Sequence, residues 1–177
     1  MSALAPAPVS VTIRAAAAAD IPLLRELAEQ TWRASYAGII SPEQMDFMLG
    51  WMYSAEQIAQ ELRDGVVWEI AELAEAPVAF LSLTLEGDEA KLNKLYVLPE
   101  QQGRGIGAEL LRHIETLAAS RGARSIWLQV NKRNERARRV YERAGYIVER
   151  ASVFEIGGGF VMDDFILRRE LRPATTG

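Results

Sequence analysis

The chain has 177 residues, of which 49% are hydrophobic and 25% are charged. This is the balance of one globular domain with a sizeable core, and it excludes a disordered or fibrous protein. A formal net charge of −4 disfavours a general nucleic-acid binder, and the lack of cysteine excludes disulfides, thiolate metal sites and a cysteine-acyl intermediate.

The two ends of the chain differ from its middle. The first ten residues have neither a basic segment nor a long apolar stretch, so we expect a frayed tail rather than a signal peptide. We predict a disordered N-terminal tail at 1–8, one domain at 9–171 and a short tail at 172–177. Since no run of roughly 18 apolar residues occurs, we expect no membrane span and a soluble, cytoplasmic protein.

Local patterns predict the elements of the first half. Apolar residues favour strands at 9–14, 66–73 and 78–85, the last two as an antiparallel hairpin. Three residues are placed to cap helices: Asp20, Ser41 and Ser54. The aromatic side chains Trp32, Tyr36 and Trp51 fall in these helices and are candidates for an acceptor pocket. Core packing or a dimer contact is the alternative for them.

A short apolar run, a glycine-rich turn and a helical pattern follow one another in the centre of the chain. The run ends at Pro99, and Gly103, Gly105 and Gly107 precede a helix that begins near Ile106. Free N–H groups at a helix N-terminus suit a phosphate or pyrophosphate. An ordinary strand-to-helix connection remains an alternative.

A dinucleotide-binding turn is a second alternative, because Gly103, Gly105 and Ala108 are in register for it. That fold expects an acidic residue after the next strand, at 125–130, but Asn131 and Lys132 follow that strand, which counts against it.

The order strand, helix, strand at this length predicts a βαβ crossover, so the strand that ends at Pro99 and the strand at 125–130 should be parallel. Asn134 is placed to cap the next helix, which ends near Gly145. Two closing strands follow at 146–155 and 160–171, joined by three glycines.

Two motifs resemble those of the GNAT superfamily of acetyl-CoA-dependent N-acetyltransferases. The first is Gln102-Gly103-Arg104-Gly105-Ile106-Gly107, which fits the pattern Gln/Arg-x-x-Gly-x-Gly/Ala, and the second is Asn134-x-x-Ala137-x-x-x-Tyr141-x-x-x-Gly145-Tyr146. The resemblance covers about residues 9–171. It implies an α/β (α+β) fold with a mixed, mostly antiparallel central sheet, one parallel βαβ pair and helices on both faces.

The resemblance also implies a site for the cosubstrate acetyl-CoA. The implied cofactor-binding residues are Leu95, Tyr96, Val97, Gln102, Gly103, Arg104, Gly105, Ile106, Gly107, Asn134, Tyr141 and Arg143. The backbone of 102–107 would hold the pyrophosphate, and Leu95 and Val97 would offer backbone groups to the pantetheine arm. A bulge near Val97 would let its N–H polarise the thioester carbonyl. Arg104 and Arg143 are phosphate neighbours in this interpretation, or else solvated surface residues.

The resemblance makes Tyr141 the general acid that protonates the leaving thiolate. A tyrosine pKa of about 10 against about 8.5 for a thiol makes this transfer uphill by ~1.5 units, roughly 2 kcal/mol. A core residue on an apolar helix face is the alternative for Tyr141. The acceptor amine must also lose a proton; Glu86, Asp163 and Asp164 are candidates by position, and ordered water is the alternative.

We therefore hypothesise an N-acetyltransferase that moves an acetyl group from acetyl-CoA to a small-molecule or peptide primary amine by direct attack in a ternary complex. We expect no metal, no nucleic-acid partner and no membrane partner. A non-catalytic acyl-CoA-binding or sensor domain on the same fold is the alternative. The acceptor, the acyl-chain preference and the oligomeric state, including a homodimer, stay open.

Overall fold

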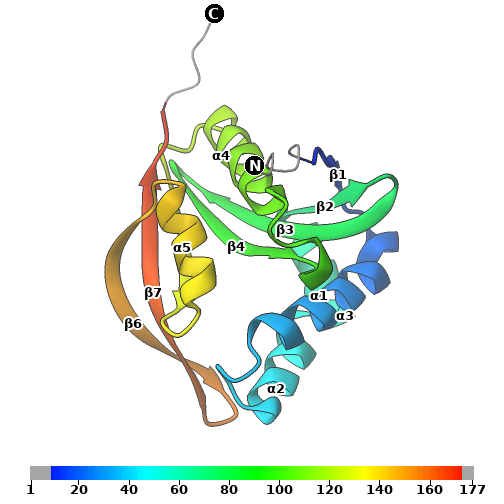
Figure 1. Ribbon diagram of the computed structural model, residues 1–177, viewed down its shortest axis with the longest axis vertical. Coiled ribbons are helices and arrows are strands. Elements are labelled where there is room, and N and C mark those ends of the chain that lie inside the picture. Colours follow the sequence, from blue (N-terminus) through cyan, green and yellow to red (C-terminus); the bar gives the residue numbers. More distant parts are fainter. Residues whose placement is uncertain (1–8, 173–177) are drawn as a thin grey trace, which may run out of the picture.

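The computed structural model describes residues 9–172 (Figure 1). The tail expected at 1–8, and the tail expected at 172–177 apart from its first residue, lie outside the described residues. The elements in chain order are β1 (Thr12–Ala15), α1 (Ile21–Ser35), α2 (Pro42–Met52), α3 (Ala55–Arg63), β2 (Val67–Leu73), β3 (Ala76–Glu86), β4 (Glu89–Val97), α4 (Ile106–Ser120), β5 (Ser125–Asn131), α5 (Glu135–Arg143), β6 (Ile147–Gly157) and β7 (Phe160–Glu170).

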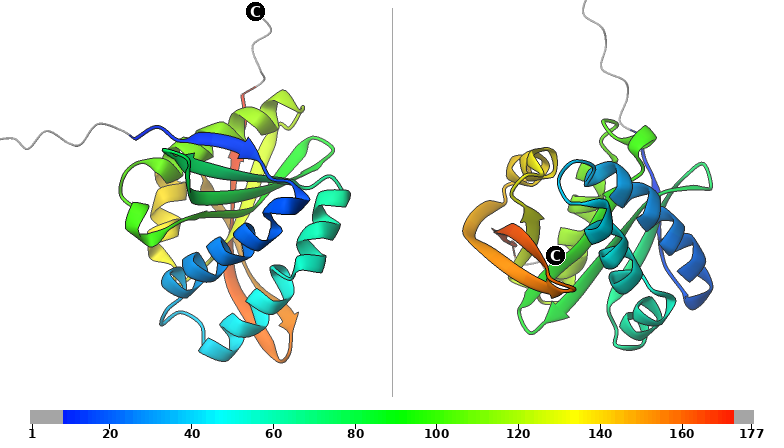
Figure 2. Two further views of the ribbon diagram at one scale, coloured as in Figure 1. Left: turned by 90° about the vertical axis from the view of Figure 1, so that its right-hand side faces the viewer. Right: turned by 90° about the horizontal axis from the view of Figure 1, so that it is seen from below.

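The strands form one sheet in the order β1-β2-β3-β4-β5-β7-β6. β4 and β5 are parallel and the other neighbouring pairs are antiparallel, which confirms the mixed, mostly antiparallel sheet with one parallel pair. Helices lie on both sides of this sheet (Figure 2). One buried cluster joins α4 and α5 to the sheet, and a second cluster joins α1, α2 and α3 to its other face.

The predicted caps explain where two of the helices begin. The Ser41 hydroxyl accepts from the Gln44 N–H at 3.1 Å, and the Ser54 hydroxyl accepts from the Gln57 N–H at 3.1 Å. Asp20 precedes α1 as expected, but its carboxylate turns back to the Ala17 N–H at 2.8 Å. The backbone of Asp20 is already helical (φ −85°, ψ −5°), so its side chain does not take the usual capping position.

β4 and β5 stay paired only from their starts to Leu92 and Leu128, and beyond these residues the two strands diverge. The register of β4 against β3 also skips Asn93, because Lys94 faces Ser82 while Leu92 faces Leu83. The bulge implied near Val97 therefore lies at Asn93 instead. Asn93 is held there by its amide, which donates to the Thr84 hydroxyl at 2.8 Å.

None of the helices in the described part of the chain reaches the length and apolar character that a membrane crossing requires.

Candidate active site

A cleft of about 1220 Å³ opens where β4 and β5 diverge. Its walls come from β4, the glycine-rich turn, the first half of α4, β5, α5 and the end of α1. Of the residues expected to bind the cofactor, these line the cleft: Leu95, Tyr96, Val97, Gln102, Gly103, Gly105, Ile106, Gly107, Asn134, Tyr141 and Arg143. The structure thus brings both sequence motifs to one space, although about thirty residues separate them along the chain.

Alternate residues of β4 direct their backbone N–H and C=O groups toward the cleft. The Leu98 N–H donates to the Val78 carbonyl of β3 at 2.8 Å. Polar backbone groups alternate between the two edges of an antiparallel strand, so those of Leu95 and Val97 point away from β3 and toward β5. The Gln102 amide donates to the Val97 carbonyl at 3.0 Å, which ties the glycine-rich turn to this strand end.

The glycine-rich turn presents backbone donors at the start of α4. Gly103 and Gly105 have φ of 78° and 83°, a conformation that residues with a Cβ rarely adopt. The first backbone hydrogen bond entering α4 runs from the Glu109 N–H to the Gly105 carbonyl at 3.1 Å. The N–H groups of residues 106–108 precede it and stay available to a ligand. This donor set fits the pyrophosphate of a coenzyme A molecule.

Five arginines line the same cleft: Arg112, Arg133, Arg136, Arg143 and Arg169. Arg169 pairs with Glu115 at 2.7 Å. Among the described residues Arg112, Arg136 and Arg143 are in no ion pair, whereas their neighbour Arg139 pairs with Glu135 at 3.3 Å. Arg104 is exposed, bonds to Gln101 and is not part of the cleft lining. Arg112 gave no signal in the sequence, because only the course of α4 across the cleft brings it there.

Tyr141 lies on α5, and Asn134 caps the start of this helix. The Asn134 side-chain oxygen accepts from the Ala137 N–H at 3.2 Å and fixes the start of the helix. The Tyr141 ring packs edge-on to Tyr146, with ring centroids 5.8 Å apart. Burial, and then the nearby Tyr36, raise the pKa of Tyr141 well above its usual value. The phenol therefore stays protonated at neutral pH, which is the form that a proton donor needs.

A second group of aromatic rings closes the cleft on the side of α1. The hydroxyl oxygens of Tyr36 and Tyr96 lie 3.3 Å apart. Trp32 packs behind them, with its ring centroid 4.5 Å from that of Tyr36 and the two rings tilted by 31°. Trp32 is 2% exposed and is not among the described residues that line the cleft. Burial and the negative charge of Asp164 raise the pKa of Tyr36 to about 12. Trp51 is 51% exposed on α2, and the structure does not bring it to the cleft.

The sequence profile of the acetyltransferase (GNAT) family matches residues 24–146, which contain all of the cleft-lining residues except Arg169. The chain belongs to the GNAT family. One fold of this kind serves many acceptors, so membership of the family does not determine which amine this chain acetylates.

Relatives of the GNAT chain agree with this assignment. An uncharacterized N-acetyltransferase of Mycobacterium tuberculosis is 27% identical over 154 residues, which are 86% of this chain and 98% of that protein. A spermidine N(1)-acetyltransferase of Thermoplasma acidophilum is 28% identical over 160 residues, 88% of this chain and 97% of that protein. The protein is thus an acyltransferase that carries out acetyl transfer.

A solved structure is similar to this chain as well. The crystal structure of the PaiA N-acetyltransferase from Thermoplasma acidophilum, in complex with coenzyme A, matches with a TM-score of 0.79 at 27% identity. The match covers 92% of this chain and 99% of that chain.

The three acidic residues expected near strand ends have different surroundings in this GNAT fold. Glu86 is exposed at the end of β3. The Asp163 side chain is 53% exposed and pairs with Lys132 at 2.5 Å, while Asp164 is 5% exposed. Within residues 9–172 no group of three or more His, Cys, Asp or Glu side chains is placed to hold a metal ion.

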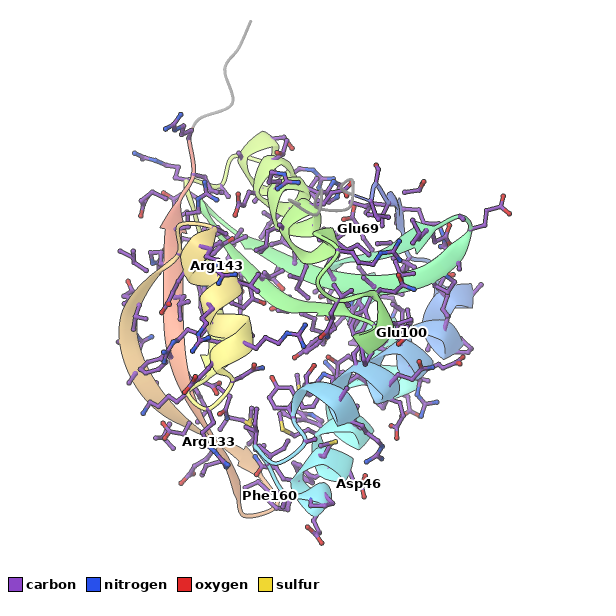
Figure 3. The ribbon with its side chains drawn as sticks, viewed as in Figure 1. Asp46, Glu69, Glu100, Arg133, Arg143 and Phe160 are labelled. Atoms are coloured by element: carbon purple, nitrogen blue, oxygen red, sulfur yellow. The ribbon has the colours of Figure 1, made fainter. Side chains whose placement is uncertain are left out.

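Arg133 ties the two sides of the cleft together, a contact that the sequence did not indicate. Its guanidinium donates to the carbonyls of Gly38 and Ile39 at 2.6 and 2.7 Å. The loop after β5 is thereby held against the loop after α1, and Figure 3 labels Arg133 between α5 and that loop.

Proposed function

We propose that this GNAT acetyltransferase moves the acetyl group of acetyl-CoA to a primary amine by direct attack in a ternary complex, with Tyr141 as general acid. One observation carries the proposal: the divergence of β4 and β5 gathers the glycine-rich turn, the free backbone edge of β4 and the Tyr141 hydroxyl in a single cleft.

Acetyl-CoA supplies an activated acyl thioester. The N–H groups of residues 106–108 and the nearby arginines bind its phosphates, and the backbone edges of Leu95 and Val97 align the pantetheine arm. The Val97 N–H polarises the thioester carbonyl. Orientation and a preorganised donor of this kind supply much of the rate in acyl transfer.

Tyr141 supplies the proton that the leaving sulfur takes up. Burial raises the pKa of this phenol. The same dry surroundings raise the pKa of a thiol, since desolvation disfavours both anions. The cost of the transfer therefore stays near the roughly 2 kcal/mol that the reference pKa values give.

We propose a cationic primary amine as the acceptor. The tyrosine hydroxyls and the aromatic rings around Trp32 offer hydrogen bonds and π faces to an ammonium group. Polyamines are the first compounds to test, because one relative is named a spermidine acetyltransferase.

The test measures free-thiol release from acetyl-CoA with spermidine, spermine, lysine peptides and amino acids as acceptors. We expect amine-dependent release that falls by about 10²-fold in Tyr141→Phe, with coenzyme A affinity unchanged. Tyr146→Phe is the matched control, since its ring packs against Tyr141 but is not among the described residues that line the cleft. Coenzyme A binding without release on the whole panel would contradict the proposal. Release unaffected by Tyr141→Phe would remove Tyr141 as the acid.

A further inference from the structure

The carboxylate of Asp164 on β7 is buried, and the steps described so far give it no role. Asp164 is 5% exposed, and among the described residues its Oδ1 atom has no hydrogen-bond partner. Leaving a buried carboxylate oxygen unpaired destabilises a fold, because the group has lost its water and gained nothing in return. Such a group is expected where a ligand completes its hydrogen bonds.

The register of the sheet directs Asp164 toward the side of α1. Asp164 lies opposite Asn131 of β5, near the end at which β5 has already left β4. Side chains two residues apart share one face of a strand, so Asp164 faces the same way as Met162. Met162 is buried in the cluster that contains Tyr36 and Trp32. The carboxylate therefore lies on the side of β7 that faces Tyr36, next to the cleft-lining residues Tyr36 and Gln129 and not itself in the lining.

Tyr36 is close enough to act electrostatically with both Asp164 and the proposed acid. The negative charge of Asp164 acts on Tyr36 and, after burial, raises its pKa. Tyr36 in turn raises the pKa of Tyr141, again after burial. Gln129, which lines the cleft, interacts with Asp164 from β5. Side chains just after α1, on α5, on β5 and on β7 are thus linked in pairs through Tyr36 and Asp164.

We propose that Asp164 binds the ammonium group of the acceptor amine and removes its proton before the attack. This inference rests on the proposed acetyl transfer and assigns its missing base. An N–H bond of the ammonium breaks and an O–H bond forms on the Asp164 carboxylate. The freed lone pair forms the N–C bond while the C–S bond breaks. Tyr141 gives its proton to the sulfur and recovers the one that nitrogen loses, and Asp164 returns its proton to water.

The surroundings of Asp164 suit a base that works near neutral pH. Burial and the charge of Asp163 raise the pKa of Asp164 to about 6, while Gln129 and Lys132 oppose the rise. Tyr36 is the titratable group that faces it from α1. A carboxyl group with this pKa is ionised at neutral pH and holds a proton more firmly than an ordinary aspartate.

The experiment compares Asp164→Asn with the neighbouring variant Asp163→Asn. Spermidine is the acceptor probe, and kcat and KM are measured between about pH 5 and 9, together with coenzyme A affinity and thermal stability. We expect Asp164→Asn to lose about 10²-fold or more in kcat/KM near neutral pH and to lose the acidic limb of the profile, with unchanged coenzyme A affinity. Asp163→Asn should keep most of the activity, because Asp163 is half exposed and paired with Lys132, and should keep the limb but move it to lower pH, because the Asp163 charge no longer raises the pKa of Asp164.

A weakly basic acceptor separates proton removal from a structural effect. An amine that is already neutral at the assay pH, such as an aryl hydrazine, needs no base, so Asp164→Asn should transfer to it at nearly the wild-type rate. Asp164→Asn with full spermidine activity and an intact acidic limb would overturn this inference alone. An equal loss with spermidine and with the aryl hydrazine would also overturn it. A wild-type protein that releases no thiol with any amine would overturn the proposed function and this inference with it.

Discussion

The hydroxyl oxygens of Tyr36 and Tyr96 lie 3.3 Å apart, one at the end of α1 and the other on β4. Burial raises the pKa of both phenols, so both keep their protons at neutral pH. Only one proton can fill the hydrogen bond between them. The other hydroxyl proton is left to an acceptor molecule or water in the cleft, which Tyr36 and Tyr96 both line.

Replacing Tyr36 by phenylalanine should weaken acceptor binding without changing coenzyme A binding. The lost hydrogen bond is worth about 1 kcal/mol, so KM for the amine should rise by roughly fivefold. Tyr53→Phe is the matched control: its hydroxyl is also buried and accepts from Trp32 at 2.8 Å, but it is not among the described cleft residues. Steady-state kinetics at saturating acetyl-CoA make the comparison, and equal KM changes in both variants would speak against a role for Tyr36 in binding.

Gly105→Ala should reduce coenzyme A affinity by straining the turn that presents the phosphate donors. The φ of 83° at Gly105 costs a residue with a Cβ roughly 1–2 kcal/mol, although the added methyl group meets open space. Relaxation of that strain moves the N–H groups ahead of α4. Calorimetric titration with coenzyme A should show a Kd raised by about tenfold.

Gly122→Ala controls for strain alone. Gly122 follows the other end of α4 with a φ of 93°, and a methyl group there also meets open space. Its stability loss should resemble that of Gly105→Ala while coenzyme A affinity stays unchanged. Weaker binding in both variants would show that global destabilisation, and not the turn, controls affinity.

Local signals in the sequence predicted the elements that depend on near neighbours. Ser41, Ser54 and Asn134 each cap a helix through a backbone N–H three residues away, so their side chains carry the information themselves. The parallel pairing of β4 and β5 also follows from local pattern, because a βαβ unit of this length leaves little choice of topology.

Pairing between distant strands and packing between distant elements determine the features that could not be predicted from the sequence. Asp163 and Asp164 are adjacent and chemically identical, yet opposite faces of β7 give one a lysine partner and bury the other. The bulge at Asn93 depends on how β3 and β4 pair, and the exposure of Trp51 depends on which face of α2 packs. None of these is decided within a few residues of chain.

Arg143→Gln should weaken coenzyme A binding and reduce its dependence on salt. Arg143 lines the cleft from α5 (Figure 3) and forms no ion pair with a described residue, so its charge is available to a phosphate. Losing one such contact should raise Kd by about threefold to tenfold at low ionic strength and less at high salt. Arg139→Gln is the control, because Arg139 lies on the same helix but pairs with Glu135. Identical salt dependence in the two variants would exclude a phosphate contact by Arg143.

The pH dependence of stability provides a separate measurement on Asp164. Its pKa of about 6 in the folded protein exceeds the ordinary 3.8 that we take for the unfolded chain. Between these two values the folded state binds more protons, so this group makes the free energy of unfolding fall as pH rises from about 4 to about 6. Below that window both states are protonated. Above it both are ionised, and the folded protein carries the full cost of the buried charge, up to about 3 kcal/mol.

Asp164→Asn removes this titration, so its stability relative to the wild type should increase from about pH 4 to pH 7 and then level off. Urea unfolding of the ligand-free protein at several pH values measures the difference. Asp163→Asn should differ from the wild type by at most about 1 kcal/mol, since its partly exposed ion pair with Lys132 contributes little. A difference between Asp164→Asn and the wild type that stays constant with pH would mean that Asp164 titrates alike in both states. The Asp164 carboxylate would then be no more basic than an ordinary aspartate, which would contradict the raised pKa on which its role as a base depends.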